Sequence, residues 1–326
     1  MVYLSAVIPV YNEEESLPEL HRQFIQVCSE NQYDYEVVFV DDGSTDRSWD
    51  TILELQRDDP RIKGIQFRRN FGKAAALNAG FKEARGEVVF TLDADLQDDP
   101  HEIPRFLASL DEENLDVISG WKKRRYDPWH KVGPSRIFNK MVSTLTKVRL
   151  HDHNCGFKCY RREVLQEVHL YGELHRFVPV LAAARGFKVG EIIVNHRKRQ
   201  FGKSKYGVRR IVKGFLDLLT VYMLTGYGHR PQHLLGTLGL TCFAGSGALT
   251  LSLIIAWVLD RLGDTEPTFH LHERAIFYFA LFGIVVGIQL LVTGFLAELV
   301  TKQTSKDEQI YAVRDSIGLD TSAPLE

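Results

Sequence analysis

The segment at residues 91–100, TLDADLQDDP, holds four carboxylates directly behind an apolar run, GEVVF. Asp93 and Asp95 stand two positions apart. Two carboxylates this close repel each other, so ionising both costs free energy unless a positive charge lies nearby. Hard cations such as Mg²⁺ bind oxygen ligands, commonly one or two carboxylates together with the phosphates of a substrate. Gln97 adds an amide oxygen in the same turn. The pattern indicates a divalent-cation site, and a solvated acidic turn before a helix fits the two aspartates equally well.

The two acids that follow, Asp98 and Asp99, directly precede Pro100. Aspartate is a favoured helix N-cap residue, and proline is tolerated in the first turn of a helix. We therefore expect these two side chains to cap the next helix.

Clusters of basic residues supply the opposite charge. Residues 196–207, HRKRQFGKSKYG, carry five Lys or Arg in twelve positions, which fits either contacts to phosphate groups or a solvated loop near anionic lipid headgroups. A second basic run at residues 121–141 includes Ser135 and Arg136, which we place at a helix start, where backbone N–H groups can bind a phosphate. Lys73 stands at another expected helix N-terminus, either as a phosphate ligand or as a cation that faces water.

Strand-like and helix-like segments alternate in the part of the chain that must position these residues. This alternation predicts an α/β domain with a mostly parallel, Rossmann-like sheet that is covered by helices on both faces. Ligands of such sheets bind at the carboxyl ends of the strands, and the pair Asp41 and Asp42 falls at such an end, as Asp93 and Asp95 do. The expected strands are residues 4–10, 36–40, 62–67, 87–93 and 115–120, and the expected helices are 13–30, 47–58, 72–84 and 100–110.

Two long apolar segments distinguish the C-terminal part of the chain. Residues 234–259 carry no charge, and residues 275–300 carry one acid, Glu298. Each exceeds the roughly 20 apolar residues that cross a bilayer as a helix, so we expect two transmembrane helices rather than two buried helices of a soluble protein. Basic residues before the first segment and after the second place both termini in the cytoplasm by the positive-inside rule. Small residues that suit close helix contact are Gly236, Gly239, Gly245 and Gly247.

The segment at residues 207–228 begins with basic residues and is amphipathic. It fits a helix in the membrane interface, and it also fits an ordinary helix of the core. We divide the chain accordingly. The expected parts are a catalytic domain at residues 1–206, amphipathic juxtamembrane helices at 207–231, two transmembrane helices at 232–301 and a polar cytoplasmic tail at 302–326.

Composition and spacing argue against several classes of protein. The formal net charge of the 326 residues is −2, so no excess of positive charge suggests a nucleic-acid partner. Four scattered cysteines fit a reducing compartment better than a disulfide framework. Residues 151–159, HDHNCGFKC, match no common structural zinc spacing. No G-x-G-x-x-G follows the first strand, which argues against a dinucleotide-binding oxidoreductase.

Five short motifs occur in an order that resembles the GT-A-fold glycosyltransferases of family 2. They are VIPVYNEEESL, VFVDDGSTDRS, RNFGKAAALNAG, TLDADLQDDP and CGFKCYRREVL, and the resemblance covers about residues 3–206. The two trailing apolar segments make the chain similar to the polyprenyl-phosphate glycosyltransferases of that family. The resemblance implies a nucleotide-sugar donor, a polyprenyl phosphate acceptor and Mg²⁺ or Mn²⁺ as the cofactor. It also implies a protein of the cell inner membrane in contact with the lipid bilayer, and we expect a homo-oligomer.

The resemblance implies roles for single residues. Asp95 and Gln97 would ligate the metal with Asp93 beside them, and Asp152 would orient the acceptor unless it only forms a turn. The residues expected to serve the transfer itself are Asp95, Asp152, Arg136 and Lys205. The acceptor phosphate would contact Ser135 and Arg136, from the helix-start argument, and Arg199. The residues expected around the nucleotide sugar are Pro9, Tyr11, Glu13, Asp41, Asp42, Lys73, Asp93, Ala94, Arg199 and Lys205.

One position departs from the family pattern. The family usually has an arginine just after the strand at residues 115–120, where this chain has Trp121 and Lys122. A contact to the donor at this point is therefore not implied by the resemblance.

The chemistry of the acceptor suggests the mechanism. A phosphomonoester is already anionic near neutral pH, so it needs positioning more than it needs a general base. We expect direct displacement at the anomeric carbon with inversion from α to β. UDP-glucose is the favoured donor, and GDP-mannose or another sugar nucleotide stays open. A polysaccharide-forming enzyme fits less well, because the chain has no Q-x-x-R-W motif and few apolar spans, and the complete acidic and basic motifs argue against a non-catalytic scaffold.

Overall fold

The computed structural model describes residues 2–123, 129–168, 174–197, 209–226, 231–262 and 270–304. Arg199 and Lys205 lie outside these ranges. The chain forms two compact units, Met1–Thr225 and Gly226–Glu326.

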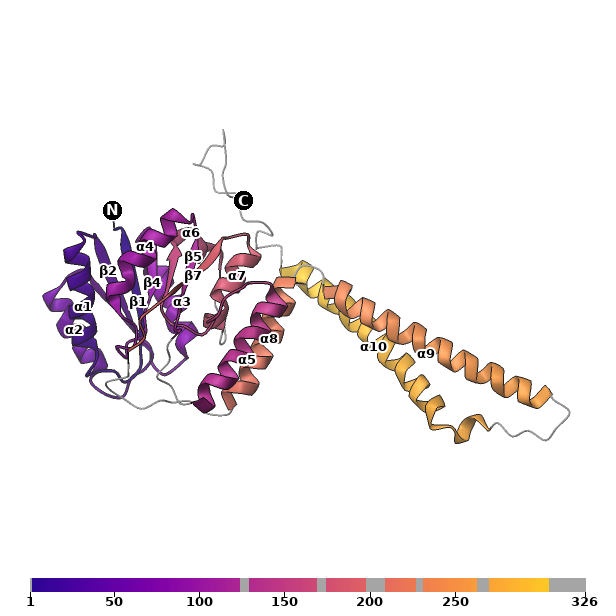
Figure 1. Cartoon of the computed structure of the whole chain (residues 1–326). Helices are drawn as coiled ribbons and strands as arrows, with labels where there is room; N and C mark the ends of the chain where they lie inside the picture. Colours follow the sequence, from indigo (N-terminus) through magenta and orange to yellow (C-terminus); the bar gives the residue numbers. More distant parts are fainter. Residues whose placement is uncertain are drawn as a thin grey trace. The chain divides into compact units, whose positions relative to one another are not determined.

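The first unit is built on a seven-stranded sheet with the strand order β3-β2-β1-β4-β6-β5-β7. All neighbouring strands are parallel except β6, which runs antiparallel to both β4 and β5. The predicted mostly parallel α/β sheet is confirmed (Figure 1). The strands are β1 (Leu4–Val10), β2 (Tyr35–Asp41), β3 (Ile62–Gln66), β4 (Val88–Thr91), β5 (Val117–Trp121), β6 (Lys158–Arg161) and β7 (Val189–Ile193).

Helices cover both faces of the sheet because successive side chains of a strand point to opposite faces. In β1, Ala6 and Ile8 belong to one apolar core, together with residues of α1, α2 and α4, whereas Val7 belongs to the other core, together with residues of α3, α6 and α7. The helices of this unit are α1 (Leu17–Glu30), α2 (Ser48–Asp58), α3 (Lys73–Glu83), α4 (Ile103–Glu112), α5 (Trp129–Thr146), α6 (Arg162–Glu167), α7 (Val178–Ala184) and α8 (Arg209–Gly226), with short 3₁₀ turns at Pro100–Glu102 and Leu174–Phe177.

The reversed direction of β6 has a consequence for the edge of the sheet where ligands bind. Lys158, the first residue of β6, pairs in register with Thr91, the last residue of β4, and with Ser119 of β5. The beginning of β6 therefore lies at the carboxyl ends of β4 and β5. Because β6 is antiparallel, its first residue, Lys158, lies at the same edge of the sheet as the acidic residues that follow β4.

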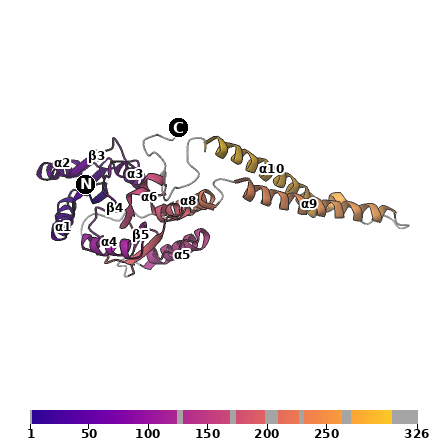
Figure 2. The same ribbon diagram turned by 90° about the horizontal axis from the view of Figure 1, so that it is seen from above.

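Helices α5 and α8 pack on each other beside the sheet domain. A third apolar cluster contains Val142 of α5 and Leu218 and Val221 of α8, so the segment predicted at residues 207–228 does contribute to a core. Its opposite face is also apolar and stays exposed at Phe215, Leu216 and Leu219. Both views of the structure show the two helices as neighbours (Figure 1, Figure 2).

The expected helix start at Ser135 and Arg136 is wrong. Helix α5 begins at Trp129, so both residues lie nearly two turns inside it. Their backbone N–H groups belong to the helix interior, where intrahelical bonds use them. Any contact between these residues and a phosphate must come from their side chains.

The second unit consists of two long apolar helices, α9 (Pro231–Leu262) and α10 (Ala275–Thr304), with a short 3₁₀ turn at Leu271–Glu273 between them. By length and composition both are candidate membrane spans, with mean hydropathies of 2.0 and 2.4. Only 6% and 11% of their most apolar windows are buried, whereas the core helix of a soluble protein would be covered by other elements. The structure therefore agrees with the two predicted spans.

Small residues bring the two apolar helices close together at several points, and Gly236 is one of them, because a Cβ on Gly294 of α10 would lie 3.4 Å from its backbone nitrogen. A Cβ on Gly239 of α9 would lie 2.8 Å from the carbonyl oxygen of Gly287 of α10. The predicted helix contact is thus confirmed at Gly239. At Gly245 and Gly247 a Cβ would meet no atom within 4 Å, so neither glycine makes such a contact between α9 and α10, and a contact with another helix stays a prediction.

Candidate active site

The acidic turn lies at the carboxyl end of β4. The strand ends at Thr91, and the chain then turns through Leu96, whose φ of 59° lies in the left-handed region. The N–H of Gln97 donates to Oδ1 of Asp95 at 3.2 Å and closes the turn. Asp93 and Asp95 therefore do not continue the strand with both side chains on one face. The Asp95 side chain is buried, whereas Asp93 stays partly exposed at the edge of the sheet.

Lys73 and Asp93 form an ion pair at this edge. Lys73 is the first residue of α3, and its Nζ contacts Oδ1 of Asp93. The two side chains are 30% and 32% exposed, so a ligand can reach the pair. The backbone of Gly156 packs against the Asp93 carboxylate. A Cβ added at this position would lie only 2.5 Å from a carboxylate oxygen of Asp93, so only glycine fits there. The ion pair thus fills the space between α3, the acidic turn and the loop before β6.

Three ammonium groups act on the carboxylate of Asp93. Burial alone would raise the pKa of Asp93, but Lys73, Lys122 and Lys158 together hold it well below its usual range. Asp93 is therefore ionised at neutral pH. Part of the counter-charge that the clustered acids require comes from lysines of the chain itself.

Lys122 makes a second ion pair beneath the acidic turn. Its Nζ lies 3.1 Å from Oδ1 of Asp98, and the other oxygen of Asp98 accepts the backbone N–H of Asp93 at 3.2 Å. Burial would lower the pKa of Lys122, but Asp98 and other nearby anionic groups raise it well above its usual value. The prediction that Asp98 caps the following helix is wrong, because this carboxylate is buried and holds Lys122 instead.

Lys158 is the third cation and the most deeply placed. It is 3% exposed, and its Nζ donates to the carbonyl oxygen of Cys155. Burial, with repulsion from Lys73, lowers the pKa of Lys158 to about 8. Its charge is therefore present at neutral pH and sensitive to mildly alkaline conditions.

The carboxyl end of β2 contributes Asp41, which is fully buried. Its Oδ1 accepts the N–H of Ser44 at 2.9 Å, and its Oδ2 accepts the amide of Gln66 at 3.2 Å. These contacts give Asp41 a structural role, which is to fix the loop after β2 against β3.

Asp42 links the end of β2 to the start of α3. Its two carboxylate oxygens accept the N–H groups of Phe71 at 2.7 Å and Gly72 at 2.9 Å. Burial raises the pKa of Asp42 in spite of these hydrogen bonds. Because Gly72 directly precedes Lys73, Asp42 positions the lysine that contacts Asp93.

The end of β1 is joined to the loop after β2. Pro9 lies within β1 opposite Val40, and the next residues, Tyr11 and Glu13, follow the strand. The backbone N–H of Glu13 donates to the hydroxyl of Ser48 at 2.9 Å. Pro9, Tyr11 and Glu13 thus lie at or just after the end of β1, next to the ends of β2 and β4, and Ala94 lies buried in the adjacent acidic turn.

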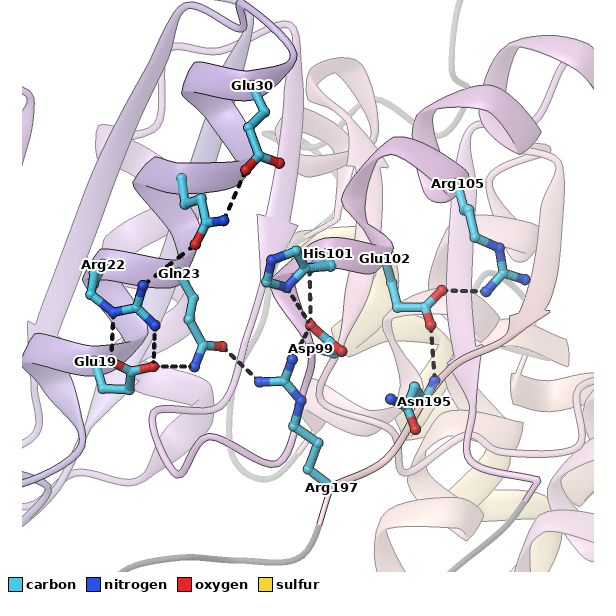
Figure 3. Close-up of polar contacts among 11 residues, drawn as sticks. Glu19, Arg22, Gln23, Glu30, Asp99, His101, Glu102, Arg105, Asn195 and Arg197 are labelled. Carbon is cyan, nitrogen blue, oxygen red and sulfur yellow. Dashed lines mark hydrogen bonds and ion pairs between the residues drawn. The ribbon is translucent and has the colours of Figure 1, made fainter.

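Arg197 connects the acidic turn to the segment after β7 (Figure 3). Its guanidinium lies 2.5 Å from Oδ1 of Asp99 and donates to Gln23 of α1 at 2.7 Å. Its backbone N–H donates to the backbone carbonyl of Gln97 at 3.0 Å. In the other direction, the side-chain amide nitrogen of Gln97 donates to the backbone carbonyl of Arg197 at 3.4 Å. Asp99 also accepts the N–H of His101, so its predicted capping role is confirmed.

Asp152 lies in the loop between α5 and β6 and is buried. Its Oδ1 accepts the N–H of Asn154 at 3.1 Å. This hydrogen bond is typical of a turn-forming aspartate, which was the alternative to the predicted role of Asp152 in orienting the acceptor. Of the two residues in α5, Ser135 is half-buried and Arg136 is exposed. The roles of these three residues in the transfer stay predictions.

The donor set at the acidic turn suits a hard cation. Asp93, Asp95 and Gln97 offer only oxygen ligands of the kind that Mg²⁺ and Mn²⁺ take. Among the residues that the structure describes, no group of three or more His, Cys, Asp or Glu could hold a metal ion. A cation here would therefore share its coordination with the amide oxygen of Gln97 and with groups from a ligand.

Sequence reasoning missed three cationic side chains of this edge, namely Lys122, Lys158 and Arg197. A lysine within the apolar stretch GFKCY was a usable signal for Lys158, since a lone charge in a buried strand requires a partner. Lys122 and Arg197 stand in the two basic runs of the sequence, but their contacts join segments far apart in the chain, so the runs do not indicate which acid each cation pairs with.

Comparison with known proteins gives concordant matches. A family model described as glycosyl transferase family 2 matches residues 5–169. The chain is 34% identical over 311 residues to dodecaprenyl-phosphate galacturonate synthase of Rhizobium johnstonii, covering 94% of this chain and 89% of the relative. It is 34% identical over 299 residues to undecaprenyl-phosphate 4-deoxy-4-formamido-L-arabinose transferase of Proteus mirabilis, covering 91% and 88%.

Solved structures share the fold at low sequence identity. Glucosyl-3-phosphoglycerate synthase from Mycobacterium tuberculosis, in complex with Mn²⁺, uridine diphosphate and phosphoglyceric acid, superposes with a TM-score of 0.51 at 15% identity. The match covers 68% of this chain and 78% of that chain. The likeness shows a GT-A-like fold for the sheet domain.

Proposed function

The chain belongs to glycosyl transferase family 2, and we propose that it transfers a sugar from a nucleotide sugar to the phosphate of a polyprenyl phosphate. The observation that carries this proposal is the convergence of the acidic turn with Lys73, Lys122 and Lys158 at the carboxyl edge of the sheet. The relatives named as a dodecaprenyl-phosphate galacturonate synthase and an undecaprenyl-phosphate 4-deoxy-4-formamido-L-arabinose transferase match 94% and 91% of the chain, which supports the proposal.

The acidic turn would hold a divalent cation through Asp95 and Gln97, with Asp93 beside it. When bound, Mg²⁺ or Mn²⁺ would neutralise negative charge on the diphosphate of the donor and on the departing nucleoside diphosphate. The relatedness in fold to a synthase crystallised with Mn²⁺ and uridine diphosphate supports this choice.

Lys73 would bind the donor from the side of α3. It is positioned by Asp42 through the N–H groups of Phe71 and Gly72, and its ion pair with Asp93 leaves the remaining N–H donors of the ammonium for phosphate oxygens. Pro9, Tyr11 and Glu13 would contact the nucleoside from β1.

The acceptor would arrive as an anionic phosphate, so the reaction requires alignment and charge screening more than proton removal. We propose that a phosphate oxygen attacks the anomeric carbon, that the bond from this carbon to the nucleoside diphosphate breaks, and that the configuration inverts. Arg136 and Ser135 of α5 would hold the acceptor phosphate by their side chains. Arg199 and Lys205 are proposed to assist from the basic loop.

The sugar and the base remain part of the proposal. UDP-glucose is the starting candidate, but the names of the relatives include a uronic acid and a formamido sugar. Both alternatives are therefore tested with the same acceptor. The two apolar helices would anchor the protein in a cell inner membrane with its sheet domain in the cytoplasm, where a polyprenyl phosphate can reach the acidic edge.

The proposal is tested by incubating the full chain in detergent with undecaprenyl phosphate, Mn²⁺ and a panel of radiolabelled nucleotide sugars. We expect one donor to give a labelled lipid product, which alkaline phosphatase does not release as free sugar. A Lys73→Gln, Asp95→Asn double variant is the control for background transfer. Absence of product with every donor would contradict the proposal.

A further inference from the structure

A basic hollow lies on the surface of the sheet domain at the C-terminal end of α5. It has a volume of about 440 Å³. Three cations and two hydroxyl residues line it, and no carboxylate of the described residues does. The lining residues are Lys140, Ser143, Thr144, Lys147 and Arg149. Within the described part of the chain, none of the three cations forms an ion pair.

The backbone at the end of α5 brings the three cations together. Lys140 and Lys147 are seven positions apart and therefore lie on the same side of the helix axis. Lys147 has a φ of 61°, in the left-handed region that residues adopt where a helix ends. This conformation turns the chain so that Arg149 returns beside the last turn of α5. The hydroxyl of Ser143 donates to the carbonyl of Leu150 at 2.8 Å and fixes the turn.

A structural role at the helix end accounts for only part of this arrangement. Basic side chains near a helix C-terminus stabilise the exposed carbonyl groups and the helix dipole, and this effect is confined to about one turn. Lys147 and Arg149 are close enough for that role. Lys140 lies six residues before Thr146, the end of α5, and its charge is not explained by the dipole.

Exposed apolar side chains occur on α5, which carries part of the hollow, and on α8, which packs against α5. Ile137 is 66% exposed and lies one helical turn before Lys140, and Leu145 of the same helix is also exposed. Helix α8, which packs on α5, exposes Phe215 and Leu219. Apolar side chains next to unpaired cations form the combination that binds an anionic membrane surface, and this chain also carries two helices long and apolar enough to span a bilayer.

We propose that the hollow at Lys140, Lys147 and Arg149 binds the phosphate of an anionic phospholipid headgroup. Three cations without carboxylate partners would favour a headgroup with a net negative charge over a zwitterionic one. None of the residues that line the hollow belongs to the acidic edge, and Arg136, to which the acceptor phosphate is assigned, lies one helical turn before Lys140 without lining the hollow. The inference does not rest on the proposed sugar transfer.

The test uses the full chain in detergent micelles and measures bound lipid by native mass spectrometry. Phosphatidylglycerol is titrated against phosphatidylcholine of the same acyl chains. The test variant is Lys140→Gln, Lys147→Gln, Arg149→Gln. A matched control removes three exposed cations from other elements, as Arg57→Gln, Lys82→Gln, Lys188→Gln.

The wild-type chain and the control variant should bind phosphatidylglycerol about tenfold or more tightly than the test variant does, since basic side chains near an anionic lipid surface attract it. Their affinities for phosphatidylcholine should be similar. Unchanged thermal unfolding of the test variant without lipid shows that it is folded, and a substituted chain that fails to fold is replaced by the single variant Lys140→Gln.

Two results would overturn the proposal. The first is an equal loss of phosphatidylglycerol binding in the control variant, which would indicate unspecific attraction to positive charge. The second is displacement of the lipid by glycerol 3-phosphate at equal concentration, which would identify a site for soluble phosphates instead.

Discussion

Lys73 and Asp93 meet at the carboxyl edge of the sheet, although they start from different elements twenty positions apart. Lys73 begins α3, and Asp93 follows β4. The pair is partly exposed, whereas Lys122 and Lys158, which also lower the pKa of Asp93, are more deeply buried. The acidic turn is therefore not a bare cluster of carboxylates, and its charge is already partly balanced before any ligand binds.

This relationship predicts the effect of removing Lys73. Lys73→Gln should raise the KM for the nucleotide sugar about tenfold or more, because a charge-assisted contact to a phosphate contributes roughly 1.5–3 kcal/mol. The KM for polyprenyl phosphate should change little. Lys82→Gln, on the exposed side of the same helix, is the matched control in a steady-state transfer assay. An unchanged donor KM in Lys73→Gln would contradict the assignment.

The lowered pKa of Lys158 leads us to predict that binding of the donor depends on pH. With a pKa of about 8, its ammonium loses the proton as pH rises from 7 to 9, and the positive charge beneath Asp93 disappears. Binding of the anionic donor should therefore weaken over this range. Measuring the donor Kd by equilibrium dialysis at several pH values checks this. Lys158→Met should bind weakly throughout and show a flatter profile, and an identical profile in both chains would speak against a role for Lys158.

His153 predicts a loss of stability in acid. Burial, with repulsion from Lys158, lowers the pKa of its imidazole to about 4, and the unfolded imidazole has a pKa near 6.5. Between these values the unfolded chain binds a proton that the folded chain does not. The free energy of unfolding should thus fall as pH drops from 6.5 to 4, by about 3 kcal/mol for this group.

The matched variant for this prediction is His153→Gln, which keeps a donor for the hydroxyl of Ser143, the partner of His153 Nε2 at 3.0 Å. Thermal unfolding of both chains at pH 7.5, 6.5, 5.5 and 4.5 in the same detergent separates the contribution of the imidazole. A variant whose Tm falls as steeply as that of the wild-type chain would show that other groups cause the acid sensitivity.

Arg197 is predicted to position the acidic turn rather than touch the donor. Its side chain bridges Asp99 and Gln23, and its backbone pairs with Gln97. Arg197→Gln should weaken Mn²⁺ binding about tenfold, and Arg197→Lys should recover part of the loss because one contact can still form. Arg105→Gln, which breaks an exposed ion pair with Glu102 in the same view (Figure 3), should leave the Mn²⁺ affinity unchanged in electron paramagnetic resonance titrations.

The sequence predicted the sheet and the acidic turn because both depend on local patterns. Apolar runs that end in Asp42 and Asp93 identify strands and the edge where they finish. The direction of β6 could not be read from GFKCY, because a short strand has the same pattern in either direction. Lys158 therefore remained outside the predicted site, although its burial is what gives it an unusual pKa.

Helix α5 begins earlier than its local sequence indicates. Gly133 and Pro134 lie within it, and both residues oppose helix formation in an interior turn. Their presence fits the predicted helix start at Ser135 better than the helix interior that the structure has there. Packing of Val142 against Leu218 and Val221 of α8 provides apolar contacts that the local signal lacks, so tertiary structure outweighs propensity here.

The central claim is that the acidic turn binds a cation that serves transfer from a nucleotide sugar to polyprenyl phosphate. The most direct test measures labelled lipid product from the full chain before EDTA, after EDTA and after restoring excess Mn²⁺, with Asp95→Asn in parallel. We predict that EDTA abolishes product formation, that Mn²⁺ restores it in the wild-type chain, and that Asp95→Asn stays at least a hundredfold less active, as expected when an electrostatic contact of several kcal/mol is lost. Full activity in EDTA, or in Asp95→Asn, would contradict the claim.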